Sequence, residues 1–358
     1  MTVFTADARP VLIGSLPHKS HREAVDLIFA YTPQIPLWPQ LPHNRKEGML
    51  LQFLPGMPGV TEKNEKIFVD IKSPDFEDQF LSFFEEYLLV TEGGAALEDS
   101  RFSMSRDEAA GFFIFLDTAR AHAAQLLGLK GQLTGPITFC TGLVDQDGKA
   151  LFYNEQLRDA AVKLLALKAK WQTRKMAEIK PSPLIFFDEP GLAGLGSSAF
   201  ITITAEDIHH CFSEVFAAVK EEGGLTGVHV CANTEWPIIL DSGVDIVSFD
   251  AYSYFDKLIL YGEHLRSFFG RGGILASGIV PTTADYIETV DGEVLTRKWL
   301  DQAAQLEKIG IAKDVIRAQT LITPSCGTGT ISEELAVRVL TLTRDVSALV
   351  QQRYTASG

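Results

Sequence analysis

Short apolar runs alternate with longer stretches of helical periodicity along most of this chain. Each run suits one buried strand, and in the longer stretches apolar positions recur every three to four residues, as on one helix face. We expect strands at 11–16, 35–40, 129–134, 184–188, 228–231, 246–250, 274–278 and 321–324. We expect helices at 160–179, 205–222, 255–269, 295–309 and 332–349. The alternation predicts an α/β protein.

Strands that alternate with helices in this way predict a (β/α)8 barrel, or TIM barrel. A doubly wound open sheet is the alternative, because the pattern does not reveal whether the sheet closes. The barrel is favoured because polar or reactive residues recur where predicted strands end, and barrel enzymes carry their active sites at that rim. These residues are Asp188, Glu189, Cys231, Asp250 and Cys326.

One segment interrupts the alternation. Residues 42–128 separate the second and third predicted strands, which is too long for one crossover helix. This segment contains a turn-rich stretch at 54–59 and helical patterns at 76–89 and 106–127. We interpret it as a helical insertion over one side of the barrel mouth, so residues 1–358 are expected to form a single TIM-barrel domain.

Charge and composition exclude several classes of function. The net charge of −14, from 32 basic and 46 acidic residues, disfavours nucleic acid and anionic membranes as partners, because both need a basic surface. Four cysteines in 358 residues are too few for a disulfide scaffold and indicate reduced thiols. Neither a signal peptide nor a membrane-spanning apolar run is predicted, so we expect a cytoplasmic protein.

The most informative residues are a histidine and two cysteines. His229 and Cys231 are two positions apart in a predicted strand, so their side chains point to the same face. They can bind zinc together with Cys326, which follows the last predicted strand, and Asp250 is a candidate fourth ligand. No paired Cys-x-x-Cys is present, which favours a catalytic zinc site with an exchangeable position over a structural one.

Each of these residues also has a structural interpretation. A His-x-Cys pair can be a core histidine beside a buried cysteine. Asp250 could orient His229 instead of binding the metal. Glu235 could replace Asp250 as a ligand, although it lies at the solvent-facing start of the following helix. Cys140 and Cys211 are expected to be core residues.

Zinc beside thiolates indicates chemistry at sulfur. A free thiol has a pKa of about 8.5, so only a few per cent is ionised at neutral pH. Coordination to zinc removes the proton. Holding a thiol ionised two units below its usual pKa requires roughly 2.7 kcal/mol, which a metal ion can supply. The predicted site therefore suits a substrate thiol that attacks a methyl group.

Several motifs resemble one superfamily. His-Val-Cys-Ala-Asn-Thr at 229–234 and Val-Asp-Ile-Val-Ser-Phe-Asp at 244–250 are similar to motifs of uroporphyrinogen decarboxylase, corrinoid methyltransferases and cobalamin-independent methionine synthase. Further matches follow the same order at 13–15, 133–138, 188–190 and 324–327. The resemblance spans the chain and corresponds to the catalytic C-terminal barrel of the long two-barrel synthases. It implies a methyltransferase that acts in methionine biosynthesis.

The resemblance also implies roles for individual residues. The zinc ligands of the synthase become His229, Cys231, Asp250 and Cys326, with Asp250 in place of a glutamate that reaches one methylene further. The homocysteine-binding residues become Ile13 and Ser15 for the carboxylate, through backbone and hydroxyl donors, together with the Asp-Glu-Pro motif of Asp188 and Glu189. In that motif, Asp188 would bind the ammonium group and act in catalysis.

The methyl donor stays open at this point. The long synthases use their additional N-terminal barrel to help hold methyl-folate, and that barrel lies outside the resemblance. A methyl-corrinoid is the other candidate donor, because His-x-Cys-x-Asn-Thr also resembles the corrinoid methyltransferases that alkylate small thiols. On that alternative the enzyme is corrinoid-dependent and its acceptor is another small thiol. The chain has no cobalamin-ligating Asp-x-His-x-x-Gly pattern, so a corrinoid would arrive free or on a corrinoid protein.

Two other functions compete with methyl transfer. A decarboxylase-like lyase on the same barrel would need no metal and several arginines near the first strands, to pair with substrate carboxylates. Residues 1–60 contain only Arg9, Arg22 and Arg45, which disfavours it. The other is a zinc- or corrinoid-binding accessory protein without catalytic activity.

Overall fold

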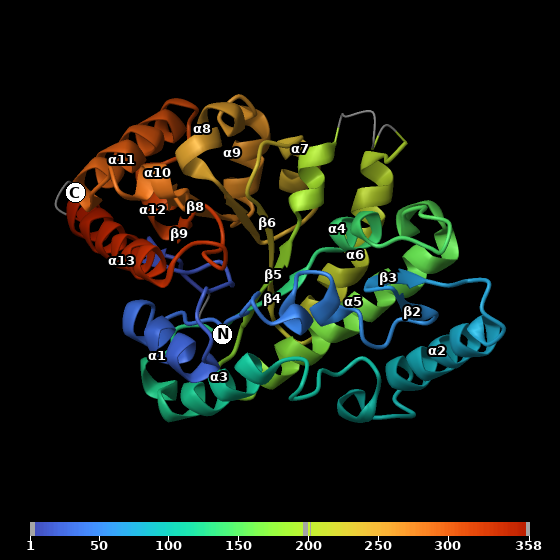
Figure 1. Ribbon diagram of the computed structural model, residues 1–358. Coiled ribbons are helices and arrows are strands. Elements are labelled where there is room, and N and C mark those ends of the chain that lie inside the picture. Colours follow the sequence, from blue (N-terminus) through green and yellow to red (C-terminus); the bar gives the residue numbers. More distant parts are fainter. Residues whose placement is uncertain (1–3, 196–199, 201, 356–358) are drawn as a thin grey trace.

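A computed structural model describes residues 4–195, 200 and 202–355 of the chain. Its centre is a parallel sheet with the strand order β1-β9-β8-β7-β6-β5-β4. The strands are β1 (Arg9–Pro10), β4 (Lys130–Thr134), β5 (Leu184–Asp188), β6 (Leu225–Val230), β7 (Ile246–Phe249), β8 (Ile274–Val280) and β9 (Thr320–Pro324). The sheet curls around its own interior, and helices surround it (Figure 1).

Helices surround the sheet, some packed on its outer face and others, such as α2, packed on those helices. The longer ones are α1 (His21–Tyr31), α2 (Phe76–Thr91), α3 (Ala110–Ala121), α5 (Glu155–Ala177), α6 (Ala205–Glu221), α8 (Ala251–Leu258), α9 (Gly262–Gly270), α11 (Gly292–Lys308) and α13 (Glu333–Thr355). The shorter ones are α4 (Pro136–Gly142), α7 (Trp236–Leu240), α10 (Ala284–Ile287) and α12 (Lys313–Ala318). Helix α5 packs on β4 and β5, α6 on β6, and α13 on β9. None of the described helices is both long and apolar enough to cross a bilayer.

The predicted alternation of strands and helices is confirmed from residue 129 onwards, with one helix predicted wrongly. The helix expected at 255–269 is two helices, α8 and α9, separated by a three-residue turn. Leu260 in this turn is 75% exposed, so the apolar pattern that suggested one continuous helix includes a side chain that is not in the core. Gly262, a weak helix former, begins the second helix.

The two edges of the curled sheet, β1 and β4, are not joined by a continuous ladder. Isolated parallel bridges connect Ser15 with Gln40 and Leu37 with Lys130. The strand predicted at 35–40 contains Pro36 and Pro39, which lack an N–H group and therefore interrupt regular pairing. No strand is assigned at 11–16 either. The short strand β1, at Arg9–Pro10, comes directly before this segment. The barrel prediction is thus confirmed only as a curled parallel sheet with a seam at these prolines.

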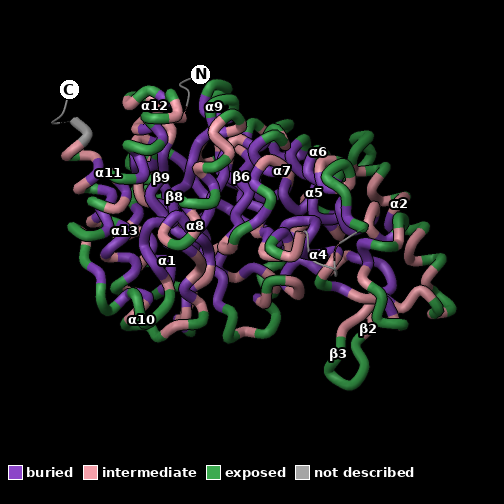
Figure 2. The backbone as a smooth tube through the Cα atoms, turned by 90° about the horizontal axis from the view of Figure 1, so that it is seen from above, coloured by how far each residue is buried: buried purple, intermediate pink, exposed green. Residues whose placement is uncertain are grey.

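Alternate residues of the strands face the interior of the curl, as the two-residue period of a strand requires. Apolar inward residues form one cluster, which includes Val11, Ile35, Leu184, Phe186, Ile246, Ile274, Ala276 and Leu321. Their neighbours on the other face, such as Ile185 and Phe187, belong to the larger core under the helices. Figure 2 shows the resulting buried centre and the exposed outer helices. Towards the carboxyl ends of the strands, inward positions become polar, as at Asp188 and His229.

Residues 42–128 contain the antiparallel hairpin of β2 (Val60–Lys63) and β3 (Lys66–Val69), together with α2 and α3. The hairpin and α2 lie at one end of the molecule, whereas α3 packs against α1 (Figure 1). The hairpin and α2 lie far from α11 and α13 (Figure 2). Two short 3-10 turns, η1 (Arg45–Glu47) and η2 (Leu51–Phe53), precede the hairpin.

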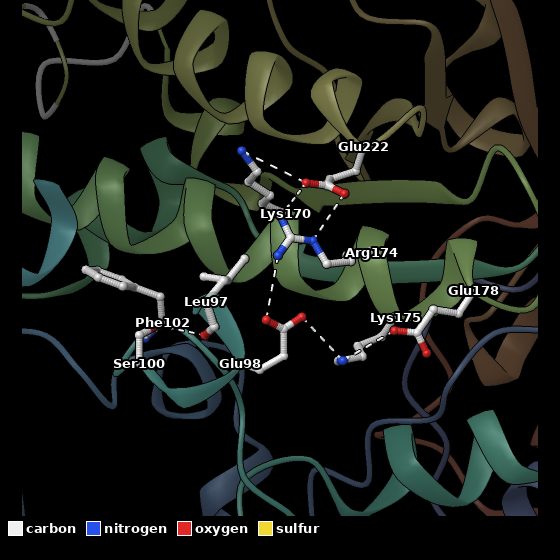
Figure 3. Close-up of polar contacts among 9 residues, drawn as sticks. All are labelled: Leu97, Glu98, Ser100, Phe102, Lys170, Arg174, Lys175, Glu178 and Glu222. Carbon is white, nitrogen blue, oxygen red and sulfur yellow. Dashed lines mark hydrogen bonds and ion pairs between the residues drawn. The ribbon is translucent and has the colours of Figure 1, made fainter. Parts of the chain in front are cut away.

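An ion-pair network connects residues 42–128 with helix α5 and with the end of helix α6. Arg174 of α5 lies between Glu222, which follows α6, and Glu98 of the 3-10 turn η3 (Leu97–Asp99) (Figure 3). The Arg174 guanidinium is 2.7 Å from Glu222 and 3.6 Å from Glu98, and Lys175 is 3.4 Å from Glu98. Several charges share partners here, which makes the network stronger than isolated surface pairs.

Replacing Arg174 by Met is expected to lower the free energy of unfolding by about 0.5–1 kcal/mol, because a shared but partly exposed ion pair is lost. The loss should shrink in about 0.5 M NaCl, since salt screens exposed charges. Chemical denaturation at both salt concentrations measures it. Arg297→Met is the control, because Arg297 is an exposed residue of α11 without an ion pair among the described residues. Equal effects of the two substitutions would contradict the prediction.

Candidate metal and substrate site

The predicted histidine and cysteines lie together. The possible ligand atoms of His229, Cys231 and Cys326 are all within 4.8 Å of one another. His229 lies in β6 and Cys231 directly follows it, whereas Cys326 follows β9. Strands β6 and β9 are separated in the sheet by β7 and β8. In a flat sheet, three spacings of about 4.8 Å would hold the strands about 14 Å apart. The curl of the sheet therefore assembles the group.

His229 is oriented by a serine on the neighbouring strand. The ring is 4% exposed, and its Nδ1 lies 2.9 Å from Ser248 Oγ. The other nitrogen, Nε2, is buried without a hydrogen-bond partner. When Nδ1 donates a hydrogen bond, Nε2 carries the lone pair, which is the tautomer that binds metals. A metal ion at Nε2 would satisfy this buried atom, so the ring fits the predicted role.

Cys231 and Cys326 are partly buried free thiols that influence each other. The contact with the Cys326 thiol, followed by the adjacent His229, lowers the pKa of Cys231. The same contact, with burial, raises the pKa of Cys326. Loss of one proton from the pair is therefore favoured, and a divalent cation would displace the second. A donor set of one imidazole and two sulfurs suits zinc.

Ser15 holds the loop that carries Cys326. The Thr328 N–H and hydroxyl each donate to the Ser15 carbonyl oxygen at 3.0 Å, and the Gly329 N–H donates to Ser15 Oγ at 3.2 Å. A Cβ atom on Gly327 would collide with Ser15 Oγ, so this close approach requires glycine. Ser15, predicted as a substrate-binding residue, thus also positions a candidate metal ligand.

Asp250 lies outside the three-residue group. It is the N-cap of α8, where its Oδ1 accepts a hydrogen bond of 2.9 Å from the Ser253 N–H. Burial raises the pKa of Asp250. The partner of His229 is Ser248, so the described contacts do not give Asp250 the orienting role considered from the sequence. Glu235 is exposed at the start of α7.

Asp188 and Glu189 are adjacent in sequence but face different surroundings. Asp188 is paired in register with His229, and its Oδ1 is buried without a partner. Burial raises the pKa of Asp188. The Glu189 carboxylate instead accepts the N–H groups of Ile137 at 2.9 Å and Thr138 at 2.7 Å, and the Thr138 hydroxyl at 2.6 Å. Glu189 therefore anchors the start of α4, while Asp188 keeps an acceptor available.

A cavity of about 300 Å³ adjoins the group. Ile13, Ser15, Asp188, His229, Cys231 and Cys326 all contribute to its wall, whereas Glu189 and Asp250 do not. The volume is at the lower end for ligand pockets, which is suitable for a small metabolite. The structure thus gathers six predicted residues, which lie in or follow β1, β5, β6 and β9, around one cavity.

Glu47 is a cavity residue that sequence reasoning missed. It is buried, and it accepts hydrogen bonds from the Leu41 N–H at 2.8 Å, from Asn44 Nδ2 at 2.9 Å and from His21 Nε2 at 2.7 Å. Asn44 and Glu47 have the spacing of a capping box, which was the available sequence signal. That signal predicts a turn, however, and does not indicate that the turn borders a cavity.

Comparisons with known proteins do not assign a family. No protein-family model matches the chain, and no curated protein matches it. Among solved structures, a B12-independent methionine synthase from Shewanella sp. W3-18-1 is similar with a TM-score of 0.47 and 18% identity over 68% of each chain. A GH20 module of the pneumococcal exo-β-D-N-acetylglucosaminidase StrH has a TM-score of 0.45 and 10% identity over 95% of this chain and 85% of that one. Both scores are below 0.5, so neither likeness decides the reaction.

Replacing Ser248 by Ala is expected to weaken zinc binding about 10- to 100-fold, because His229 loses the partner that fixes its tautomer. Competition with a chromogenic chelator measures the affinity, and the number of ions bound at saturation should not change. Ser277→Ala is the control. Ser277 is also a buried serine, but its neighbour Ala276 faces the interior of the curl, so Ser277 points to the outer face of β8, away from His229. An affinity that is unchanged in Ser248→Ala would contradict the assigned role.

Proposed function

We propose that this protein is a zinc-dependent methyltransferase that methylates a small thiol, and that homocysteine is the acceptor. The observation that carries the proposal is the group of His229, Cys231 and Cys326 at a cavity wall, with the buried His229 Nε2 lacking a partner. Three protein ligands leave one position of a zinc tetrahedron for a substrate, as in catalytic zinc sites. The motif resemblance supports the same reaction.

The proposal includes the architecture. The bridged segment 35–40 would take the place of the second strand of a (β/α)8 barrel, and residues 42–128 would be an insertion within a single domain. The bridges on both sides of the segment support this interpretation.

The acceptor would be held at both ends by residues that line the cavity. Zinc, when bound, supplies a Lewis acid that keeps the acceptor thiol ionised at neutral pH. The free Oδ1 of Asp188 suits the ammonium group. Ile13 and Ser15 suit the carboxylate, because their N–H groups donate no hydrogen bond to any described residue. With both ends held, the sulfur attacks the methyl carbon in line, and the donor leaves with the bonding electron pair.

The size of the cavity restricts how the donor can bind. A volume of about 300 Å³ accommodates an amino-acid thiol but not a whole folate or corrinoid in addition. Either donor would therefore present its methyl group at the mouth and keep most of its own bulk outside. Methyl-folate and a methyl-corrinoid, free or on a corrinoid protein, both fit this placement.

A decarboxylase-like lyase has less support. Such an enzyme needs arginines to pair with several substrate carboxylates. Among the described residues that line the cavity, none is arginine or lysine. An accessory role without catalysis is distinguished by the turnover assay that follows.

The zinc-loaded protein is expected to methylate homocysteine from methylcobalamin or methyl-tetrahydrofolate, with methionine detected by mass spectrometry. Cys326→Ser should reduce the rate at least about 100-fold, because zinc loses a thiolate ligand. Cys211→Ala is the control, since Cys211 is a buried thiol of α6 away from the cavity. Zinc binding without turnover of any donor and thiol pair would leave only the accessory role.

Replacing Asp188 by Asn is expected to raise the KM for homocysteine at least about 10-fold, because a charge-assisted hydrogen bond to the ammonium group is lost. The matched acceptor is 4-mercaptobutanoate, which lacks the amino group, and its KM should change by less than about twofold. Steady-state kinetics with both thiols measures the difference. Equal changes for the two acceptors would remove Asp188 from ammonium binding.

A further inference from the structure

Three successive inward residues of β4 bind main-chain carbonyl groups across the seam of the sheet. The pairs are Lys130 Nζ with Ile13 O, Gln132 Nε2 with Trp38 O at 2.7 Å, and Thr134 Oγ1 with Met49 O. Ladder hydrogen bonds are interrupted here by Pro36 and Pro39. Side chains thus replace backbone pairing along this edge, and Lys130 is the charged member of the set.

Lys130 occupies an unusual environment for a lysine. Its side chain is fully buried, its Nζ lies 4.4 Å from the centre of the Phe186 ring, and Gln132 Oε1 accepts a second hydrogen bond at 3.3 Å. No carboxylate of the described residues forms an ion pair with it within 4.0 Å. Burial lowers the pKa of Lys130 to about 8, and Asp188 opposes that shift. The ammonium group is therefore still mostly charged at neutral pH, although burying an unpaired charge is costly.

The bond from Lys130 fixes a wall of the cavity. Its acceptor, the Ile13 carbonyl, belongs to residues 13–15, and Ile13 and Ser15 both line the cavity. Lys130 itself does not line the cavity, so it lies directly behind that wall. An anionic group bound at Ile13 and Ser15 would add a negative charge on the side of Lys130 that faces this wall.

We propose that Lys130 is a positioning residue for the carboxylate of the acceptor: it holds residues 13–15 in place and sets a positive charge behind them. This inference rests on the proposed function, because it assigns a role to Lys130 in amino-acid binding. It specifies that the acceptor is a thiol with a carboxylate, and that the preference for the carboxylate comes from a residue outside the cavity wall.

Kinetics with two acceptors test this role. Lys130→Met is expected to raise the KM for homocysteine about 10-fold or more, with kcat changed less than about threefold. The KM for 3-aminopropanethiol, which lacks only the carboxylate, should change less than about twofold. Lys130→Arg should recover part of the loss because it keeps the charge, and Lys130→Gln repeats the test if the Met variant does not fold. Equal changes in KM for both acceptors would overturn the inference.

Lys168 provides a matched control. It is also a fully buried lysine, in α5, with its Nζ 3.3 Å from the Ser103 carbonyl oxygen, and burial also lowers its pKa to about 8. Lys168→Met should affect stability but should not change the ratio of the two KM values. If it changes the ratio as much as Lys130→Met does, the effect comes from losing any buried lysine, and the inference fails.

Hydrogen exchange separates this inference from the proposed function. In the metal-free protein, Lys130→Met should accelerate exchange within residues 11–16 at least about fivefold at the hydrogen-bonded amides of Val11 and Leu16, and leave residues 225–231 unchanged, because exchange of bonded amides reports local opening. If the wild type methylates no thiol, the proposed function fails, and this measurement still decides whether Lys130 fixes the wall. Unchanged exchange in residues 11–16 would overturn the positioning role even in an active enzyme.

Discussion

The curvature of the parallel sheet is the constraint on which the candidate site depends. His229 and Cys231 at β6 reach Cys326 beyond β9 only because the intervening strands bend round. The apolar cluster inside the curl, which includes Phe186 and Leu321, fills the space that this bend encloses. Packing of that cluster therefore determines the separation of the three ligand atoms, although none of its members is a ligand. The apolar cluster and the candidate site therefore lie in the same space inside the curled sheet, the site towards the carboxyl ends of the strands.

Much of the site could be predicted from the sequence because its residues occur at strand ends. The two-residue spacing of His229 and Cys231 fixes a common face, and Cys326 follows a strand that parallel pairing brings to the same edge. The role of Ser248 could not be predicted, since a serine inside an apolar strand gives no indication of its cross-strand partner. The place of Glu47 at the cavity could not be predicted either, because it belongs to a turn whose position depends on long-range packing.

The alternation of strands and helices could be predicted from the sequence, but the interrupted pairing at residues 35–40 could not. Apolar periodicity identified the buried strands β4 to β9, each of which has its donors paired with a neighbour. At 35–40 the same periodicity is present, but Pro36 and Pro39 remove the donors that a ladder needs. The pattern of apolar residues reports burial, whereas regular pairing also requires N–H groups. The break at Leu260 shows that an apolar residue need not belong to a buried helix face, because its side chain is exposed to solvent.

Ser15 has two roles, and this limits which substitutions the protein can accept at that position. The same residue faces the cavity and anchors the loop of Cys326 through Thr328 and Gly329. A substitution there would alter ligand selection and metal retention in one step, so natural variation at this position is penalised twice. Met49 also lines the cavity, but its hydrogen bond is with Thr134 and not with the loop of Cys326. Divergence towards other acceptors is therefore expected to proceed through positions such as Met49, and Ser15 is expected to remain fixed among descendants that retain the ion.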